Sequence, residues 1–160
     1  MRIASTTKRT SQAGSLYRLI YCSRNVIARA LPGADVHEEI RAILEIARQR
    51  NKSATVTGAL LFTASGFAQV LEGPREWVER LFEQISADPR HSDVMVLSFT
   101  PTERRCFPDW PMGFYGSLET ADLLADFLSA SPVSPRATTG SDMLRLLEKV
   151  VRQEDMWIAA

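Results

Sequence analysis

A β-hairpin near the middle of the chain is the feature that most restricts the possible folds. Residues 57–62 (TGALLF) are apolar on both faces, as in a central strand, and residues 66–73 (GFAQVLEG) form a second strand between two glycines. The turn at residues 63–66 is too short to join these strands in any way other than antiparallel. Helical segments are predicted on both sides of the hairpin, so the fold must place two helices on a sheet.

The remaining elements follow from hydrophobic periodicity. Residues 16–23 and 94–99 are predicted strands, and residues 107–114 are a predicted edge strand because prolines cannot donate to a ladder. Asp35 is expected to cap a first helix that runs to about Asn51, and Gly73-Pro74 to begin a second helix. The expected buried stripes of the two helices are Ile40, Ile43, Leu44 and Ala47, and Trp77, Val78, Leu81, Phe82 and Ile85.

The order of these elements, β-α-β-β-α-β-β, predicts an α+β fold. It is typical of the ferredoxin-like arrangement, an antiparallel-rich sheet with both helices on one face. In that arrangement the strand at residues 16–23 lies beside the strand at residues 66–73 in the centre of the sheet. Side chains of these two strands that point towards the helices therefore meet in the gap between the helices.

The amide of Gln69 is expected on an apolar face, because alternate residues of a strand share a face and its companions are Phe67 and Leu71. A buried amide without a partner costs about 2 kcal/mol or more, so Gln69 needs a hydrogen bond. The partner can come from a neighbouring strand or the backbone, or from the polar edge of a ligand. Tyr21 is predicted to lie on the neighbouring strand and to face the same gap.

The first helix ends in two polar residues that continue its apolar stripe. Asn51 lies four residues after Ala47, and Arg50 lies at the edge of the stripe. Both residue types are also favoured at helix C-termini, so simple capping is an open alternative. The convergence of Tyr21, Gln69 and Asn51 on one apolar slot predicts a binding site for a planar ligand with a polar edge.

Both ends of the chain are predicted to lie outside this domain. Residues 1–15 are polar, basic and rich in Ser and Thr, which predicts a disordered tail with some character of an organellar transit peptide. Residues 116–160 are predicted to form a C-terminal helical extension, with a helix at 118–128, a Ser/Pro-rich linker at 131–139 and a last amphipathic helix capped by Ser141. That last helix is expected to pack on the open face of the sheet or on a second subunit.

Charge and cysteine content argue against several classes of protein. The 19 basic and 19 acidic residues cancel, although residues 1–34 carry six basic side chains and no acidic one. These six are scattered over a tail and a strand, which gives little support for a nucleic-acid site. No apolar run approaches the ~20 residues needed to span a bilayer. Cys22 and Cys106 stand apart from any zinc motif, which predicts structural thiols in a reducing, cytoplasmic compartment.

A series of short motifs lies within residues 16–115 in a defined order and spacing. They are residues 19–23 (LIYCS), Arg50-Asn51 followed by Thr57-Gly58, residues 67–73 (FAQVLEG), residues 88–91 (DPRH) and residues 110–112 (WPM). Together they closely resemble the BLUF family, the blue-light sensors that use FAD. Each motif is weak alone, whereas FAQVLEG and TGALL together are specific. The resemblance implies a flavin-binding domain at residues 16–115, of the short type on which no effector domain follows.

The resemblance implies that FAD binds between the two helices. Gln69 would hydrogen-bond the N5/O4 edge of the flavin and Tyr21, while Asn51 would hold the carbonyl side of the flavin with Arg50 beside it. Tyr21 would donate an electron and a proton on excitation, leaving Gln69 rotated or tautomerised. Family members vary at the position of Arg50, so the resemblance does not fix its contact. The slot would contact mainly the ring that FAD and FMN share, so it does not by itself distinguish these two cofactors.

Four further residues are implied to act near the ring. Trp110 and Met112, as alternate residues of the last predicted strand, would compete for the place beside Gln69 and transmit its state outward. Asp88 and His91 would make contacts near the ring. The resulting prediction is a blue-light photoreceptor that is not an enzyme, forms a homo-oligomer and signals to a partner protein whose identity the sequence does not give.

Two other classes of function are compatible with this fold. A small flavin-dependent or acylphosphatase-like enzyme is the first, but a hydrolase needs an anion site, and Arg50 and Asn51 lie at a helix C-terminus, where the dipole disfavours anions. A structural oligomer is the second, with the aromatic residues as core, and it would be colourless. The visible absorption spectrum before and after blue light separates these classes.

Overall fold

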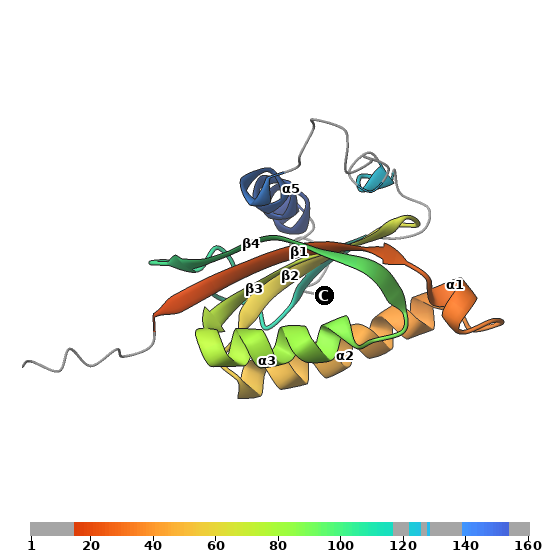
Figure 1. Cartoon of the computed structure of the whole chain (residues 1–160), viewed down its shortest axis with the longest axis horizontal. Coiled ribbons are helices and arrows are strands. Elements are labelled where there is room, and N and C mark those ends of the chain that lie inside the picture. The colour runs from red at the N-terminus through yellow and green to blue at the C-terminus, as the bar shows by residue number, and fades with distance from the viewer. Residues whose placement is uncertain (1–14, 117–121, 126–127, 129–138, 154–160) are drawn as a thin grey trace, which may run out of the picture.

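The computed structural model describes residues 15–116, 122–125, 128 and 139–153 of the 160-residue chain. Its centre is a five-stranded sheet in the order β4-β1-β3-β2-β5, with helices on both faces (Figure 1). The elements are β1 (Leu16–Asn25), α1 (Ile27–Ala30), α2 (Val36–Ser53), β2 (Thr57–Phe62), β3 (Gly66–Pro74), α3 (Arg75–Ser86), β4 (His91–Thr102), β5 (Gly113–Gly116) and α5 (Gly140–Gln153).

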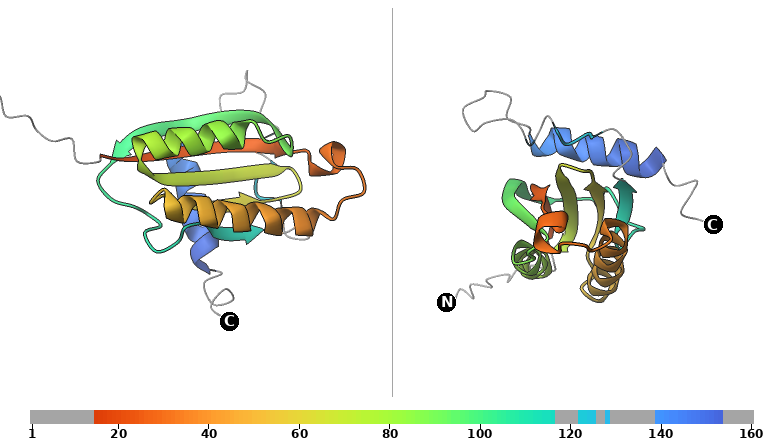
Figure 2. Two further views of the ribbon diagram at one scale, coloured as in Figure 1. Left: turned by 90° about the horizontal axis from the view of Figure 1, so that it is seen from below. Right: turned by 90° about the vertical axis from the view of Figure 1, so that its right-hand side faces the viewer.

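The predicted ferredoxin-like α+β architecture is confirmed. β1 lies between β3 and β4 and is antiparallel to both, and β2 is antiparallel to β3. β5 joins one edge of the sheet parallel to β2. The register pairs Tyr21 directly with Gln69, so the two residues are neighbours on central strands. Seen from below, β3 runs between α2 and α3, which lie side by side on one face (Figure 2, left).

Local sequence explains where the two large helices begin. A carboxylate oxygen of Asp35 accepts hydrogen bonds from the main-chain N–H groups of His37 and Glu38, two of the donors that a helix start leaves free. Pro74 immediately precedes α3 with φ −58°, a value already suited to helix entry. Both helices therefore start where the sequence predicts.

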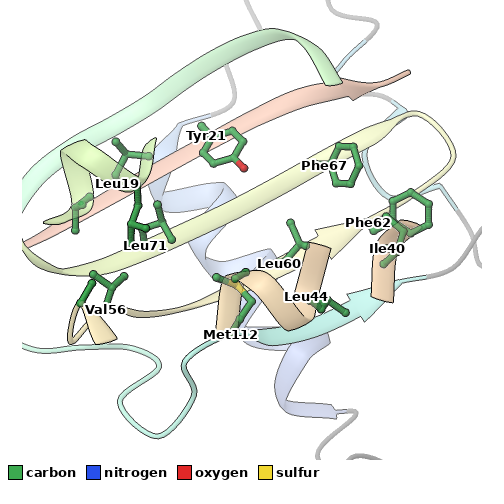
Figure 3. Packing of buried hydrophobic residues seen from close by; sticks show 14 of the residues in the cluster. Leu19, Tyr21, Ile40, Leu44, Val56, Leu60, Phe62, Phe67, Leu71 and Met112 are labelled. Atoms are coloured by element: carbon green, nitrogen blue, oxygen red, sulfur yellow. The ribbon is translucent and has the colours of Figure 1, made fainter. Parts of the chain in front are cut away.

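Alternate residues of the central strands face two separate cores. One core lies under α2 and α3 and contains Leu19, Tyr21, Leu60, Phe67 and Met112 (Figure 3). The other lies under α5, which crosses the opposite face of the sheet (Figure 2, right), and it includes Ile20, Cys22, Val70, Met143 and Leu147. Of the two positions expected for the last helix, the structure has the one on the open face of the sheet.

Some local predictions are wrong. The edge strand predicted at residues 107–114 pairs with β2 only from Gly113 onward, because the prolines before it supply no ladder donors and the chain there turns and bends. The indole of Trp77 is 43% exposed rather than buried, since it lies at the edge of a stripe whose buried members are Val78 and Leu81. The short helix α1, in the connection after β1, was not predicted.

Other predictions fall where the structure gives no description. The tail at residues 1–15, the helix at 118–128 and the linker at 131–139 lie wholly or largely outside the described residues, and the division into domains stays a prediction. In the part of the chain that is described, no helix is both long and apolar enough to cross a membrane.

Candidate functional site

A cavity of about 220 Å³ lies between α2 and α3, on the helix-covered face of the sheet. Three strands form its base, aliphatic side chains from the two helices form its walls, and polar side chains surround it. The base consists of Tyr21, Leu60, Phe67 and Gln69, the walls of Ile43, Ile46, Ala47 and Ile85, and the polar groups of Arg50, Asn51, Gln84, Asp88, Arg90 and His91. The cavity thus brings together six of the residues that the sequence predicts for the site.

Gln69 lies at the base of the cavity and is 4% exposed. Its Oε1 accepts a hydrogen bond from the Tyr21 hydroxyl at 2.5 Å, and its Nε2 donates to Sδ of Met112 at 3.5 Å. A thioether sulfur is a weak acceptor, whereas the amide oxygen is a strong one. The amide therefore has one strong and one weak hydrogen bond within the protein, and both come from residues distant in sequence.

Tyr21 is buried against the inner face of α3. Its ring centroid lies 5.5 Å from that of Phe82 and 6.3 Å from that of His91. Burial raises the pKa of the phenol well above its usual value, and the negative charge of Asp88 adds to this rise. Tyr21 is consequently a neutral hydrogen-bond donor to Gln69 at any physiological pH.

Asn51 and Arg50 do more than cap α2. The Asn51 amide, 2% exposed, donates to the main-chain oxygen of Pro111 at 2.7 Å and so ties the end of α2 to the segment before β5. The Arg50 guanidinium donates through Nη1 to Oε1 of Gln84 at 2.9 Å, while its Nε is buried and has no hydrogen-bond partner in the described part of the chain. An unpartnered buried donor beside a cavity indicates a place for an acceptor from a ligand.

Asp88 and Arg90 form a pair at one end of the cavity. The Arg90 guanidinium donates to both carboxylate oxygens of Asp88, at 2.9 and 2.6 Å, and to Oε2 of Glu39 at 3.2 Å. Burial alone would raise the pKa of Asp88, but the hydrogen bonds and charge of Arg90 outweigh it and lower the pKa. The carboxylate is therefore occupied by the protein itself.

His91 is also engaged through both ring nitrogens. Its Nε2 lies 2.6 Å from the main-chain oxygen of Ile85, and its Nδ1 lies 2.8 Å from the hydroxyl of Ser23. A carbonyl can only accept, so Nε2 carries a proton. His91 thus positions the rings around it, and a ligand would meet the imidazole without displacing either hydrogen bond.

The structure distinguishes Met112 from Trp110. Met112 is 2% exposed and lies beside Gln69, in the core under α2 and α3. Trp110 stacks on Phe107, with ring centroids 5.9 Å apart, and packs against the core under α5. The two residues precede β5 rather than belonging to it, so the alternation expected of a strand does not apply to them.

Several residues of the cavity were missed by sequence reasoning. Ile46 is 48% exposed and lies off the buried stripe of α2, yet it forms part of a cavity wall. An apolar residue outside the stripe was the signal that could have found it. Gln84 and Arg90 carried no such signal, because their roles depend on contacts with other elements.

The residues present fit a flavin ring. Aliphatic side chains of two helices face each other across the cavity, and amide, phenol and guanidinium groups lie at its polar edge. Such walls suit a planar aromatic ligand, and the unpartnered Nε of Arg50 suits one with acceptor atoms. Across the described residues, no group of three or more His, Cys, Asp or Glu side chains could hold a metal ion.

Comparison with known proteins gives a consistent family match. The model of the family "BLUF: Sensors of blue-light using FAD" matches residues 16–113. The photoactivated adenylate cyclase subunit beta of Euglena longa is 34% identical over 90 residues, which are 56% of this chain and 10% of that protein. The chain therefore spans about a tenth of the length of this curated relative.

Two solved structures are similar over more of their length. The dark-state structure of BlrB, a BLUF protein, is 37% identical with a TM-score of 0.58, covering 64% of this chain and 74% of that one. The photo-activated state of BlsA is 26% identical with a TM-score of 0.67, covering 85% of this chain and 94% of that one.

Proposed function

This chain belongs to the BLUF family of sensors of blue light using FAD, and we propose that it signals through the hydrogen bonds that Gln69 makes with Tyr21 and Met112. As a member of this family it is a blue-light photoreceptor with FAD as its cofactor. The observation that carries the proposal is the buried 2.5 Å bond from Tyr21 to Gln69 at the base of the cavity.

Bound FAD supplies the absorption of blue light and an acceptor for one electron. With FAD bound, Tyr21 would give up that electron, and its hydroxyl proton would pass to Oε1 of Gln69, the atom to which it is already hydrogen-bonded. Loss of an electron makes a phenol proton strongly acidic, so the two losses are coupled. The electron and the proton would both return to Tyr21 while Gln69 stays rearranged, so the signalling state would keep Tyr21 and the flavin in their original redox states and the cycle would leave no net chemical change.

The residue that stores the signal is Gln69. Its amide has a donor end and an acceptor end, so a reversal presents Nε2 to Tyr21 and Oε1 to Met112. The sulfur of Met112 has no proton to donate, so the reversed amide loses this hydrogen bond. In a low-dielectric cavity such an exchange is worth a few kcal/mol, enough to shift a two-state element.

Met112 passes this change to the edge of the sheet. It immediately precedes β5, and its main-chain oxygen accepts a hydrogen bond from Nε of Arg48 on α2 at 3.2 Å. The neighbouring Pro111 is held by Asn51. A displacement of Met112 therefore acts on both β5 and α2. We assign the output to a partner protein, with the chain acting as a homo-oligomeric sensor rather than as an enzyme.

The test is the visible spectrum of the purified protein before and after blue light. The wild type is expected to show a flavin spectrum that shifts slightly to the red and recovers in darkness. Gln69→Leu is expected to bind flavin and to show no shift, because the side chain can no longer exchange donor for acceptor. Tyr21→Phe, which lacks the proton, is expected to lose the shift as well. An unchanged photocycle in Gln69→Leu would contradict the mechanism.

A further inference from the structure

A groove of about 440 Å³ continues from the cavity along the slit between α2 and α3. It shares Arg50 and Gln84 with the cavity, and Trp77, Arg80 and Leu81 from α3 form one side of it. We call it the Trp77 groove. A second groove, of about 370 Å³, shares Gln84, Asp88 and Arg90 with the cavity. A ligand too long for the cavity can extend into either of these grooves.

The two grooves differ in charge. In the groove at Asp88, Arg90 is the one cation among the described lining residues, and it is paired with Asp88 and with Glu39, so two carboxylates face one guanidinium. Among the described residues, those that line the Trp77 groove include Arg50 and Arg80 and no carboxylate. Neither of these arginines forms an ion pair within the described residues, and Nε of Arg50 is buried without a partner.

An anion leaving the cavity is therefore favoured in the Trp77 groove and opposed in the other. The C-terminus of α2 lies at the Trp77 groove, but it contributes only about half a negative charge against two full positive ones. Guanidinium groups also match phosphate oxygens in geometry, which a helix end cannot do.

Trp77 gives this groove a flat surface. Its indole is 43% exposed, and the guanidinium of Arg80 lies over the ring, 5.3 Å from its centroid. The core does not account for a tryptophan in this position, because Val78 and Leu81 are the residues of α3 that are buried. Indole rings and guanidinium planes are the two kinds of side-chain surface on which nucleobases stack.

We propose that the Trp77 groove binds the adenosine diphosphate portion of FAD and makes this chain select FAD over FMN. Trp77 and Arg80 offer the surface for the adenine, and Arg50 and Arg80 neutralise the phosphates. This rests on the proposed function, in which the flavin ring occupies the cavity between α2 and α3.

The test measures the affinity of the flavin-free chain for FAD, FMN and riboflavin by the quenching of flavin fluorescence. The wild type is expected to bind FAD about tenfold more tightly than FMN, a typical effect for one stacked base. Trp77→Ala is expected to remove this preference while leaving riboflavin affinity unchanged, and Trp77→Phe to retain most of it. Arg80→Gln is expected to weaken FAD binding several-fold and to reduce its dependence on salt.

Arg145→Gln is the matched control, because it removes one exposed arginine from α5 on the opposite face of the sheet. It is expected to leave all three affinities unchanged. Equal wild-type affinities for FAD and FMN, together with an intact photocycle, would overturn the role proposed for the Trp77 groove but not the proposed function. Equal losses for all three flavins in Trp77→Ala would also overturn it. Failure of the wild type to bind any flavin would overturn both proposals.

Discussion

Gln69 and Glu72 lie three residues apart on β3 and point to opposite faces of the sheet, where they meet opposite conditions. Gln69 has one strong hydrogen bond, from Tyr21, and one weak bond to the sulfur of Met112. Glu72, which is fully buried, accepts from the guanidinium of Arg18 and from the main-chain N–H groups of Cys106 and Phe107, at 2.8 to 2.9 Å.

The difference separates a residue that can switch from one that cannot. The donors around Glu72 are charged or belong to the main chain, so any rotation would leave buried groups without partners. Rotation of Gln69 exchanges its two ends between Tyr21 and a weak acceptor. The free energies of its two orientations therefore differ by less than those of Glu72 would. The face under α2 and α3 thus holds a polar group that can change its partners, while the face under α5 holds one that is fixed.

The largest expected effect comes from removing the Glu72 carboxylate, on the face of the sheet under α5. Glu72→Ala removes the carboxylate partner of the half-buried Arg18 guanidinium, which keeps its hydrogen bond to the main-chain oxygen of Arg104, and it leaves the main-chain N–H groups of Cys106 and Phe107 without their acceptor. It is expected to reduce the free energy of unfolding by about 3–5 kcal/mol. Urea unfolding of the flavin-loaded protein measures this. Glu72→Gln keeps an acceptor oxygen and should lose less. If Glu72→Ala and the wild type were equally stable, Glu72 would not be held more firmly by its hydrogen bonds than Gln69.

A smaller effect is expected from changing Met112, beside Gln69 on the face of the sheet under α2 and α3. Met112→Leu keeps the volume of the side chain but removes the sulfur acceptor, so the free energy of unfolding should change by less than about 1.5 kcal/mol. The red shift should persist, because Tyr21 and Gln69 are intact. Light-induced changes in hydrogen exchange at residues 113–116 should become weaker than in the wild type. An undiminished exchange response would remove Met112 from the route of the signal.

The smallest effect concerns the ion pair at the end of the cavity. Asp88 has a lowered pKa in the fold, so its pair with Arg90 stabilises the protein above about pH 3.8 and this contribution is lost as the pH falls through the lowered pKa. Asp88→Asn should therefore reduce the free energy of unfolding at pH 7 by less than about 1 kcal/mol, with no difference in acid.

Asp93→Asn serves as its control. The ion pair of Asp93 with Arg24 is long, at 3.5 Å, and its carboxylate is largely exposed, so no change is expected at either pH. A stability difference for Asp88→Asn that persisted in acid would assign the effect to packing rather than to the charge.

The sequence by itself determined the order of the elements, the two large helices and the central pairing of β1 with β3. The elements and their order follow from short-range signals, namely periodicity, the Asp35 cap and the turn at residues 63–66. The pairing of β1 with β3 follows from the ferredoxin-like arrangement that this order predicts. The same signals placed Tyr21, Gln69 and Asn51 on one cavity, because a strand's alternation and a helix's stripe fix which face a residue occupies.

Only the tertiary structure decided the contacts that depend on irregular chain or on distant donors. Met112 rather than Trp110 lies beside Gln69 because the residues before Gly113 form no strand, so alternation gives no guide to their direction. The N–H groups that fix Glu72 come from residues 34 and 35 positions further along the chain, beyond the reach of any local pattern. Whether α5 packs on the open face of the sheet likewise depends on contacts with strands that are distant in the sequence.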